Sequence, residues 1–296
     1  MFFISVAAAI GASFGWATGI VLAHFPARAV GVFEFTRIQL VACSAIMAAI
    51  CSVLGYWPTI IWSQWPLFAA SIGVGIVLGN LAMIECLRCG GPRRTELLLS
   101  LKAPIVGLVA YIWLGETLNY QDIVGIAIVL AGITLSILFG EVKANKNDTL
   151  VGGIGKIVVL GISAAAFQGL GFLLMKPAML AGTEPLAASA VRLLGAAFLI
   201  SIIALWPARS FRSNTEMTPL LLFRTILPGF IGYGISSSLM LFAYANLEGG
   251  VAAVLGSLSP ILVLPIIWMK DRQPPNVYAV IGALIAVAGI AIILLY

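Results

Sequence analysis

Three basic residues stand inside long apolar stretches of the sequence: Lys102, Arg37 and Arg192. Lys102 lies in ELLLSLKAPIVGLVAYIWLGE, residues 96–116, which is long enough to cross a bilayer as a helix. A cation at membrane depth costs about 3 kcal/mol unless it meets water or a partner. Because Lys and Arg bind carboxylates through charge-assisted hydrogen bonds, these residues predict a site for a small carboxylate-bearing ligand.

Two glutamates offer the opposite chemistry. Glu85 and Glu96 would recognise a cationic ligand. Each lies three residues from an arginine, as Glu34 does from Arg37, and this spacing lets two side chains on one helix face neutralise each other. The alternative role for Arg37 and Arg192 is that of an anchor reaching the lipid headgroups.

Aromatic and sulfur-containing residues complete the candidates. Trp16 and Tyr244 lie among small or polar neighbours, and we expect them to contact a flat or amphipathic substrate. Cys86 and Cys89 form a C-x-x-C pair, but a zinc site needs a second pair or histidines, and His24 is the only histidine. We therefore expect no metal, no cofactor and no enzymatic activity.

The composition indicates the surroundings of these residues. Of 296 residues, 61% are hydrophobic and only 9% are charged, and the mean hydropathy is +1.12. A soluble domain has about 25% charged residues, so this chain belongs in a bilayer, as a multi-pass protein of the cell membrane. Its net charge of +5 includes no basic run of the kind that follows nucleic-acid phosphates, so no nucleic-acid partner is expected.

Ten apolar segments are visible, and we expect ten transmembrane helices. A polar stretch, residues 141–152, is expected to link a first five-helix repeat, residues 1–140, to a second, residues 153–296. The first segment lacks a basic n-region and is interpreted as a retained helix rather than a signal peptide. The segments are approximately 3–23, 31–54, 66–88, 93–114, 121–140, 153–175, 186–206, 219–243, 250–269 and 277–296.

The two halves resemble each other. FTRIQLVACSAI matches AVRLLGAAFLI and pairs Arg37 with Arg192, while GIAIVLAGITL matches GALIAVAGIAI and pairs Gly125 with Gly282. An odd number of helices per repeat would insert the halves in opposite orientations, so Arg37 and Arg192 should lie toward opposite membrane faces. Inverted repeats typify secondary transporters, with the substrate site between the halves near the midplane.

Comparison of the two halves supports a functional role for Lys102, because its counterpart in the second half is Ser259. The fold evidently does not need a cation at this place, and no acidic residue lies three or four positions from Lys102 on its helix. Pro104 bends the helix nearby, which is tolerated beside a cavity. We expect Lys102 to face a central cavity and bind substrate; the alternative is a structural lysine that reaches water or an acid on another helix.

The basic residues of the connections predict orientation. The positive-inside rule would place the connections between segments 1–2, 3–4, 5–6, 7–8 and 9–10 in the cytoplasm and both termini outside, because the other side carries only Lys176. The residues on the first set are Arg28, Arg88, Arg93, Arg94, Lys143, Lys146, Arg209, Arg212, Lys270 and Arg272.

The stretch LSLKAPIVGLVAYIWLGETLNYQDIVGIAIVLAGITL resembles the repeat signature of the drug/metabolite transporter superfamily, in its ten-helix EamA-type branch. It has a proline near the start of the fourth helix, Leu-Gly-Glu at its end, and a following helix with two spaced glycines. The second copy keeps Pro260, Gly282 and Gly289 but has Lys-Asp-Arg where Leu-Gly-Glu is expected. The resemblance implies a cavity lined mostly by helices 1, 3, 4, 6, 8 and 9, proton-driven export of metabolites, and cytoplasmic termini, contrary to the charge count.

Taken with the residues, these patterns predict a secondary active transporter that exports a small polar or amphipathic metabolite by alternating access. The substrate is expected to be an amino acid or related carboxylate, with protons as coupling ion, and the protein a monomer or weak homodimer. The alternative is an exporter of cationic, drug-like compounds recognised by Glu85 or Glu96. A passive channel and a membrane-embedded enzyme are the remaining alternatives.

Overall fold

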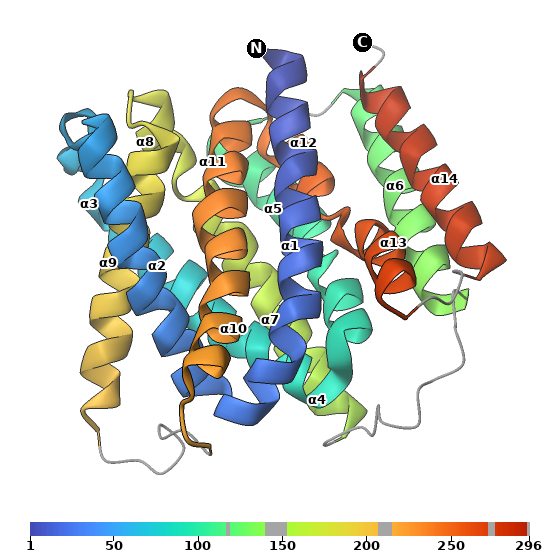
Figure 1. Cartoon of the computed structure of the whole chain (residues 1–296). Helices are drawn as coiled ribbons and strands as arrows, with labels where there is room; N and C mark the ends of the chain where they lie inside the picture. Colours follow the sequence, from blue (N-terminus) through green and yellow to red (C-terminus); the bar gives the residue numbers. More distant parts are fainter. Residues whose placement is uncertain (117–118, 140–152, 207–214, 272–275, 295–296) are drawn as a thin grey trace.

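The computed structural model describes residues 1–116, 119–139, 153–206, 215–271 and 276–294. All regular elements within these ranges are helices, so the predicted all-α class is confirmed for them (Figure 1). The predicted linker, residues 141–152, lies outside the described residues. The division of the chain into two repeats at that linker therefore stays a prediction.

The helices of the first half follow the predicted apolar segments, but α1 is longer than expected, and α4 runs across the predicted boundary between segments 66–88 and 93–114, where it is kinked at Gly91, with φ 76°. Helix α1 continues to Val30, and Gly31, with φ 94°, separates it from α2. Two short 3-10 turns precede α3. The helices are α1 (Phe2–Val30), α2 (Val32–Leu54), α3 (Trp65–Ala70), the π-helical η3 (Ser71–Leu78), α4 (Gly79–Leu99), α5 (Lys102–Val109), the π-helical η4 (Ala110–Leu114) and α6 (Tyr120–Phe139).

The second half repeats this pattern, including a π-helical segment at the place that corresponds to η3. Its helices are α7 (Ile154–Leu173), α8 (Lys176–Leu180), α9 (Pro185–Ala204), α10 (Pro219–Gly229), the π-helical η6 (Phe230–Ser236), α11 (Ser237–Asn246), α12 (Gly249–Gly256), α13 (Ser259–Asp271) and α14 (Val277–Leu294).

Length and composition let seven helical stretches of the described residues cross a membrane. Three shorter apolar helices, Lys102–Leu114, Tyr120–Leu135 and Val280–Ile290, accompany them. The chain is thus built as a multi-pass membrane protein, while the count of ten crossings stays a prediction. The seven stretches are Phe2–Val30, Val32–Leu54, Trp62–Gly91, Ile154–Leu180, Pro185–Ala204, Pro219–Asn246 and Gly249–Ile266.

Two apolar segments are interrupted at matching places of the two halves. The regular helix stops at residues 100–101, between α4 and α5, and at residues 257–258, between α12 and α13. The first residue after each break is Lys102 or Ser259, the pair that the repeat predicts. Non-helical backbone at membrane depth is tolerated where it lines a cavity or is covered by protein, so the breaks mark the region where a site is expected.

Close backbone approaches hold the two halves together. A methyl group added at Gly75 in η3 would lie 2.5 Å from the Cα atom of Gly171 in α7, so the two helices touch backbone to backbone there. Only glycine permits such an approach, which brings the flanking side chains of η3 and α7 into one region.

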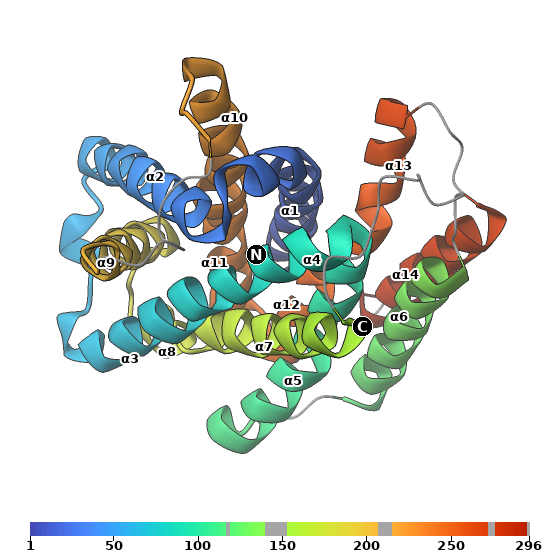
Figure 2. The same cartoon turned by 90° about the horizontal axis from the view of Figure 1, so that it is seen from below.

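The helices α6 and α14 pack side by side at one edge of the molecule, as Figures 1 and 2 both show. A methyl group at Gly132 would lie 2.5 Å from the carbonyl oxygen of Gly282, and one at Gly289 would lie 2.8 Å from that of Gly125. The repeat alignment that pairs Gly125 with Gly282 also pairs Gly132 with Gly289. The two close approaches therefore involve equivalent residues of the two halves. An antiparallel, inverted relation of the halves would produce this contact, and that relation stays a prediction.

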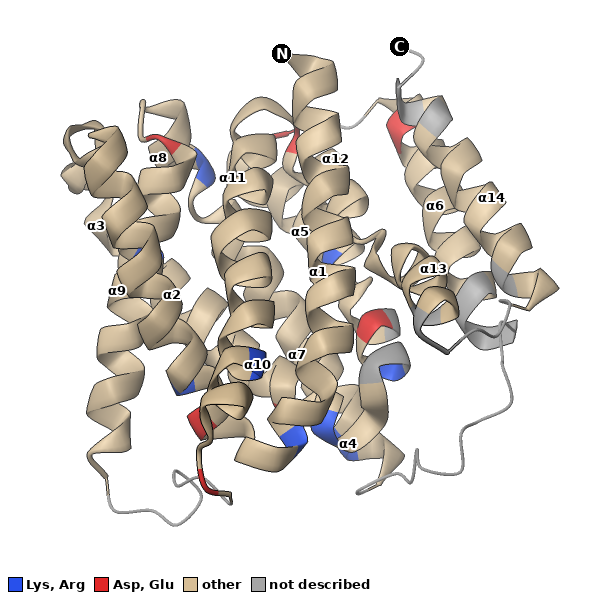
Figure 3. Ribbon diagram, viewed as in Figure 1, with Lys and Arg blue, Asp and Glu red and all other residues tan. Residues whose placement is uncertain are grey.

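The two ends of the molecule differ in charge. Both termini lie at one end (Figure 1), and most of the described Lys and Arg residues gather toward the other (Figure 3). Seven of the ten residues counted for the charge rule, such as Lys143 and Arg209, lie outside the residues or side chains that the structure describes. The predicted orientation, with both termini outside the cytoplasm, remains untested.

Candidate functional site

A cavity of about 960 Å³, its mouth included, lies among helices of both halves. On α1 its lining runs from Trp16 to Ala23, and on η3 and α4 it runs from Gly75 to Leu99. Because α1 starts at the end that carries the termini (Figure 1), its lining residues begin at the middle of the helix and continue toward the opposite end.

The lining agrees in part with what the family resemblance implies. Residues of α1, of η3 with α4, of α5, of α7, of η6 and of α12 with α13 contribute, which correspond to predicted segments 1, 3, 4, 6, 8 and 9. Segments 2 and 7 add one polar residue each, Gln39 from α2 and Arg192 from α9. The cavity therefore gains a buried cation, the predicted site residue Arg192, from a helix outside the set that the family resemblance implies.

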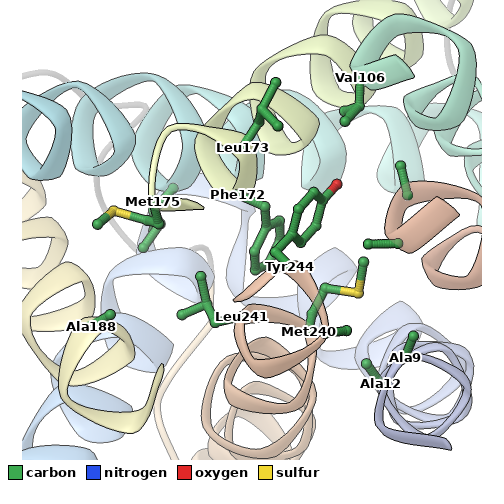
Figure 4. Packing of buried hydrophobic residues seen from close by; sticks show 14 of the residues in the cluster. Ala9, Ala12, Val106, Phe172, Leu173, Met175, Ala188, Met240, Leu241 and Tyr244 are labelled. Carbon is green, nitrogen blue, oxygen red and sulfur yellow. The ribbon is translucent and has the colours of Figure 1, made fainter. Parts of the chain in front are cut away.

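Aromatic rings form one wall of the cavity. The ring of Phe172 lies 5.7 Å from that of Trp16 and stacks on that of Tyr244, with centroids 5.9 Å apart and planes at 2° (Figure 4). Trp16 and Phe172 line the cavity, and the Trp16 indole N–H donates to the carbonyl oxygen of Gly232 at 3.3 Å. Tyr244 is buried behind Phe172 in the apolar core, so it supports the wall and is not part of its surface.

Lys102 faces this cavity, at the break between α4 and α5. Its Nζ lies 4.9 Å from the centre of the Trp16 ring, within the range of a cation–π interaction, and donates to Oε1 of Gln168 at 3.2 Å. Glu96, one and a half turns earlier, is buried in the same lining, and the charges of Glu96 and Lys102 interact. The side chain of Arg93, three residues from Glu96, lies outside the described residues.

Gln168 joins Lys102 to the opposite wall. Its amide Nε2 donates to Oδ1 of Asn80 at 2.9 Å and lies 3.2 Å from the sulfur of Met83. A methyl group at Gly79 would lie 2.9 Å from the Gln168 side chain, so this glycine makes room for the amide. The network links α5, α7 and α4 across the cavity and fixes the position of the ammonium group.

Arg192 reaches the cavity from α9 and is only 2% exposed. Its Nε donates to Oγ of Ser71 at 2.8 Å, and that hydroxyl donates to the carbonyl oxygen of Gly171 at 2.5 Å. The guanidinium carbon lies 4.8 Å from the centre of the Phe172 ring. Its Nη1 is buried and has no hydrogen-bond partner among the described residues, which is unusual for a buried donor.

Two predicted site residues lie elsewhere. Arg37 is on α2, half-exposed, and its Nη2 pairs with Oε1 of Glu34 at 2.6 Å. Glu85 accepts from Nε of Arg88 at 2.7 Å and from Nζ of Lys156 at 2.6 Å. The neutralising pairs that the three-residue spacing predicts are thus confirmed at both places, and neither residue lines the cavity. Their roles in substrate binding stay predictions without support from the geometry.

Four polar or aromatic residues of the site escape sequence reasoning: Ser71, Asn80, Gln168 and Phe172. Uncharged amides and hydroxyls within apolar segments stand out less than charges. One signal was available, because Gln168 and Phe172 are four residues apart and therefore share a helix face. Within the described residues, no group of three or more His, Cys, Asp and Glu side chains is arranged to hold a metal.

Comparison with known proteins agrees with the fold. The model of the EamA-like transporter family matches residues 3–138 and again residues 155–295. The chain is 31% identical over 106 residues to a Sinorhizobium sp. protein described as "Uncharacterized transporter in cobO 3'region", which spans 35% of this chain and 75% of that protein. A solved protein structure with no function in its description aligns with a TM-score of 0.76 at 17% identity, over 98% of this chain and 96% of that one, a likeness of fold alone.

Proposed function

Because the chain belongs to the EamA-like transporter family, we propose that this multi-pass membrane transporter is a secondary active carrier that exports a small carboxylate-bearing metabolite. The observation that carries the proposal is the presence of two cations, Lys102 and Arg192, in one largely buried cavity with an aromatic wall between them. In a site of low dielectric constant such groups attract an anion much more strongly than at a water-exposed surface.

Alternating access is supported by how the cavity is built. Both halves contribute to its lining, and the breaks beside Lys102 and Ser259 lie at matching places of the two halves. The π-helical η3 and η6 likewise match, and irregular segments of this kind concentrate where helices bend or move. Rocking of one half against the other would open the cavity to each membrane face in turn, with protons as the coupling ion.

Export of cationic, drug-like compounds is the second candidate. Glu96 favours it, because this carboxylate is buried in the cavity lining. The charge of Lys102 acts on Glu96, however, and Glu85 is already held by Arg88 and Lys156. Neither candidate glutamate is therefore left with an uncompensated negative charge, whereas Arg192 has no ion pair among the described residues. This difference favours a carboxylate over a cation as the substrate.

Counterflow in proteoliposomes tests the proposal. Vesicles containing the full-length protein are loaded with an unlabelled compound, and saturable entry of the same labelled compound is measured for a panel of carboxylates, amino acids and organic cations. We expect counterflow for carboxylates, with none in empty vesicles. Passage without saturation or counterflow would indicate a channel, chemical conversion of the compound would indicate an enzyme, and counterflow of cations alone would favour the second candidate.

A further inference from the structure

Of the cations that line the cavity, Arg192 is the one without a compensating charge. The four ion pairs among the described residues involve other side chains, and none includes Arg192. Lys102 shares the lining with Glu96, and these two groups are neutral as a pair whichever of them holds the exchangeable proton. The described lining therefore carries a net charge of about +1, located at the guanidinium group.

The guanidinium group is also held in place before any ligand arrives. Nε is fixed by Ser71, and Ser71 is itself fixed by the carbonyl oxygen of Gly171. One face of the group packs on the Phe172 ring. The part of the guanidinium group that is left for a ligand is the edge that carries Nη1, a buried donor without a partner among the described residues. Such an edge matches the two oxygens of a carboxylate, and its fixed position lowers the entropic cost of binding.

From these observations we infer that the cargo is a monocarboxylate without an ammonium group, bound through its carboxylate to the free edge of Arg192. The inference rests on the proposed carrier function and narrows the substrate class. A single negative charge neutralises the cavity, whereas a dicarboxylate would leave one charge in excess. The ammonium group of an amino acid would need an acidic partner, and the acid of the described lining, Glu96, already interacts with the charge of Lys102.

The apolar part of the cargo follows from the neighbours of Arg192. Phe172 lies directly beside the guanidinium group, and the Trp16 ring, with its centroid 5.7 Å from that of Phe172, continues the wall. Most other lining residues are apolar or glycine. A cargo with a flat or compact apolar body would cover this wall while its carboxylate reaches Arg192.

Three compounds that share one phenyl ring test which charged group the cavity binds. 3-Phenylpropanoate carries a carboxylate, 2-phenylethylamine carries an ammonium group, and phenylalanine carries both. Thermal unfolding of the purified full-length protein is followed with each compound, because a ligand of the native state raises the unfolding temperature. We expect a rise with 3-phenylpropanoate and a dissociation constant at least about tenfold weaker for the other two. An equal or larger effect of phenylalanine or 2-phenylethylamine, or no effect of 3-phenylpropanoate, would overturn the inference.

Variants of the protein then test whether the carboxylate of 3-phenylpropanoate binds at Arg192. Arg192→Gln should weaken 3-phenylpropanoate binding at least about tenfold and, without ligand, raise the unfolding temperature, because it removes an unpaired buried charge. A structural arginine would give a lower unfolding temperature instead. Ser71→Ala, which frees the guanidinium group, should weaken binding in a folded protein. Arg94→Gln, at an exposed arginine, is the matched control and should bind as the wild type does.

The carrier proposal and the inference fail in different ways. Counterflow of a carboxylate that survives Arg192→Gln would overturn the inference and leave the carrier function standing. Binding of 3-phenylpropanoate that depends on Arg192, without counterflow of any compound, would support the inference and remove the carrier function. Arg192→Lys tests the same edge in a second variant, since it keeps the charge but loses the paired N–H donors of the guanidinium group; unchanged affinity in that variant would count against the inference.

Discussion

Lys176 and Glu116 form an ion pair that joins the two halves of the chain. Their side chains are only 9% and 14% exposed. Glu116, the glutamate of the Leu-Gly-Glu signature, also accepts the backbone N–H of Gly249 at 2.6 Å, while Lys176 donates to the carbonyl oxygen of Leu247 at 2.8 Å. The pair therefore connects the end of the fourth segment with the start of α8 and of α12.

Breaking this pair should destabilise the protein. Lys176→Met leaves a nearly buried carboxylate without its cation, so we expect the free energy of unfolding to fall by about 3 kcal/mol. Lys156→Met is the matched control, because it removes a lysine from an ion pair in which that side chain is 53% exposed, and a much smaller loss is expected. Denaturant titration of the two variants measures both values, and equal losses would contradict the prediction.

Lys102→Met should abolish transport while the protein stays folded. The variant loses the ammonium group that donates to Gln168 and lies over Trp16, so Glu96 is left without its nearby charge. Lys102→Arg keeps the charge but changes its geometry, and partial activity is expected. Counterflow and thermal unfolding of both variants provide the measurement. Wild-type transport by Lys102→Met would show that the lysine is structural.

Substitutions at Gly132 and Gly289 should destabilise the protein to a similar extent. Each glycine lets α6 and α14 approach, and a side chain at either would meet the backbone of the other helix. Gly132→Leu and Gly289→Leu should therefore lower the unfolding free energy by similar amounts, of about 1–3 kcal/mol. Gly155→Leu, at a glycine with open space around it, serves as the control. A large loss at one of the two positions and none at the other would contradict the predicted relation of the halves.

Both termini should lie outside the cytoplasm. The basic residues of the connections motivate this expectation, and the described Lys and Arg gather at the end opposite the termini. A reporter enzyme fused after residue 296 should be active only in its non-cytoplasmic form, and one fused after residue 145 only in its cytoplasmic form. The opposite result from functional full-length protein would support the topology that the family resemblance implies.

The sequence was most informative about segments and about Lys102. Apolar runs separated by short polar connections locate the helices, and a cation deep in such a run without an acid on its own helix face predicts a cavity. The same test separates Arg37 from Arg192, although the repeat treats them as equivalent. Arg37 has Glu34 three positions away, whereas alanine, serine and glycine occupy the neighbouring turns around Arg192.

Other features depend on three-dimensional packing and could not be predicted. The hydroxyl of Ser71 fixes Arg192 only because Gly75 and Gly171 bring η3 and α7 together. Phe172 contacts the rings of Trp16 and Tyr244 because helices that are distant in the sequence pack together. Pairs of this kind depend on distances between helices, about which a single sequence says little.

The reciprocal contact of α6 and α14 has an evolutionary consequence. A single five-helix unit with this glycine face would pair with a copy of itself, because the contact is the same from both sides. In such a homodimer, every substitution would appear twice. Two units on one chain change independently, so a lysine can stand at position 102 while Ser259 occupies the matching place. Joining the units thus permits a binding site with unequal charges on its two sides, which a symmetric ancestor cannot form.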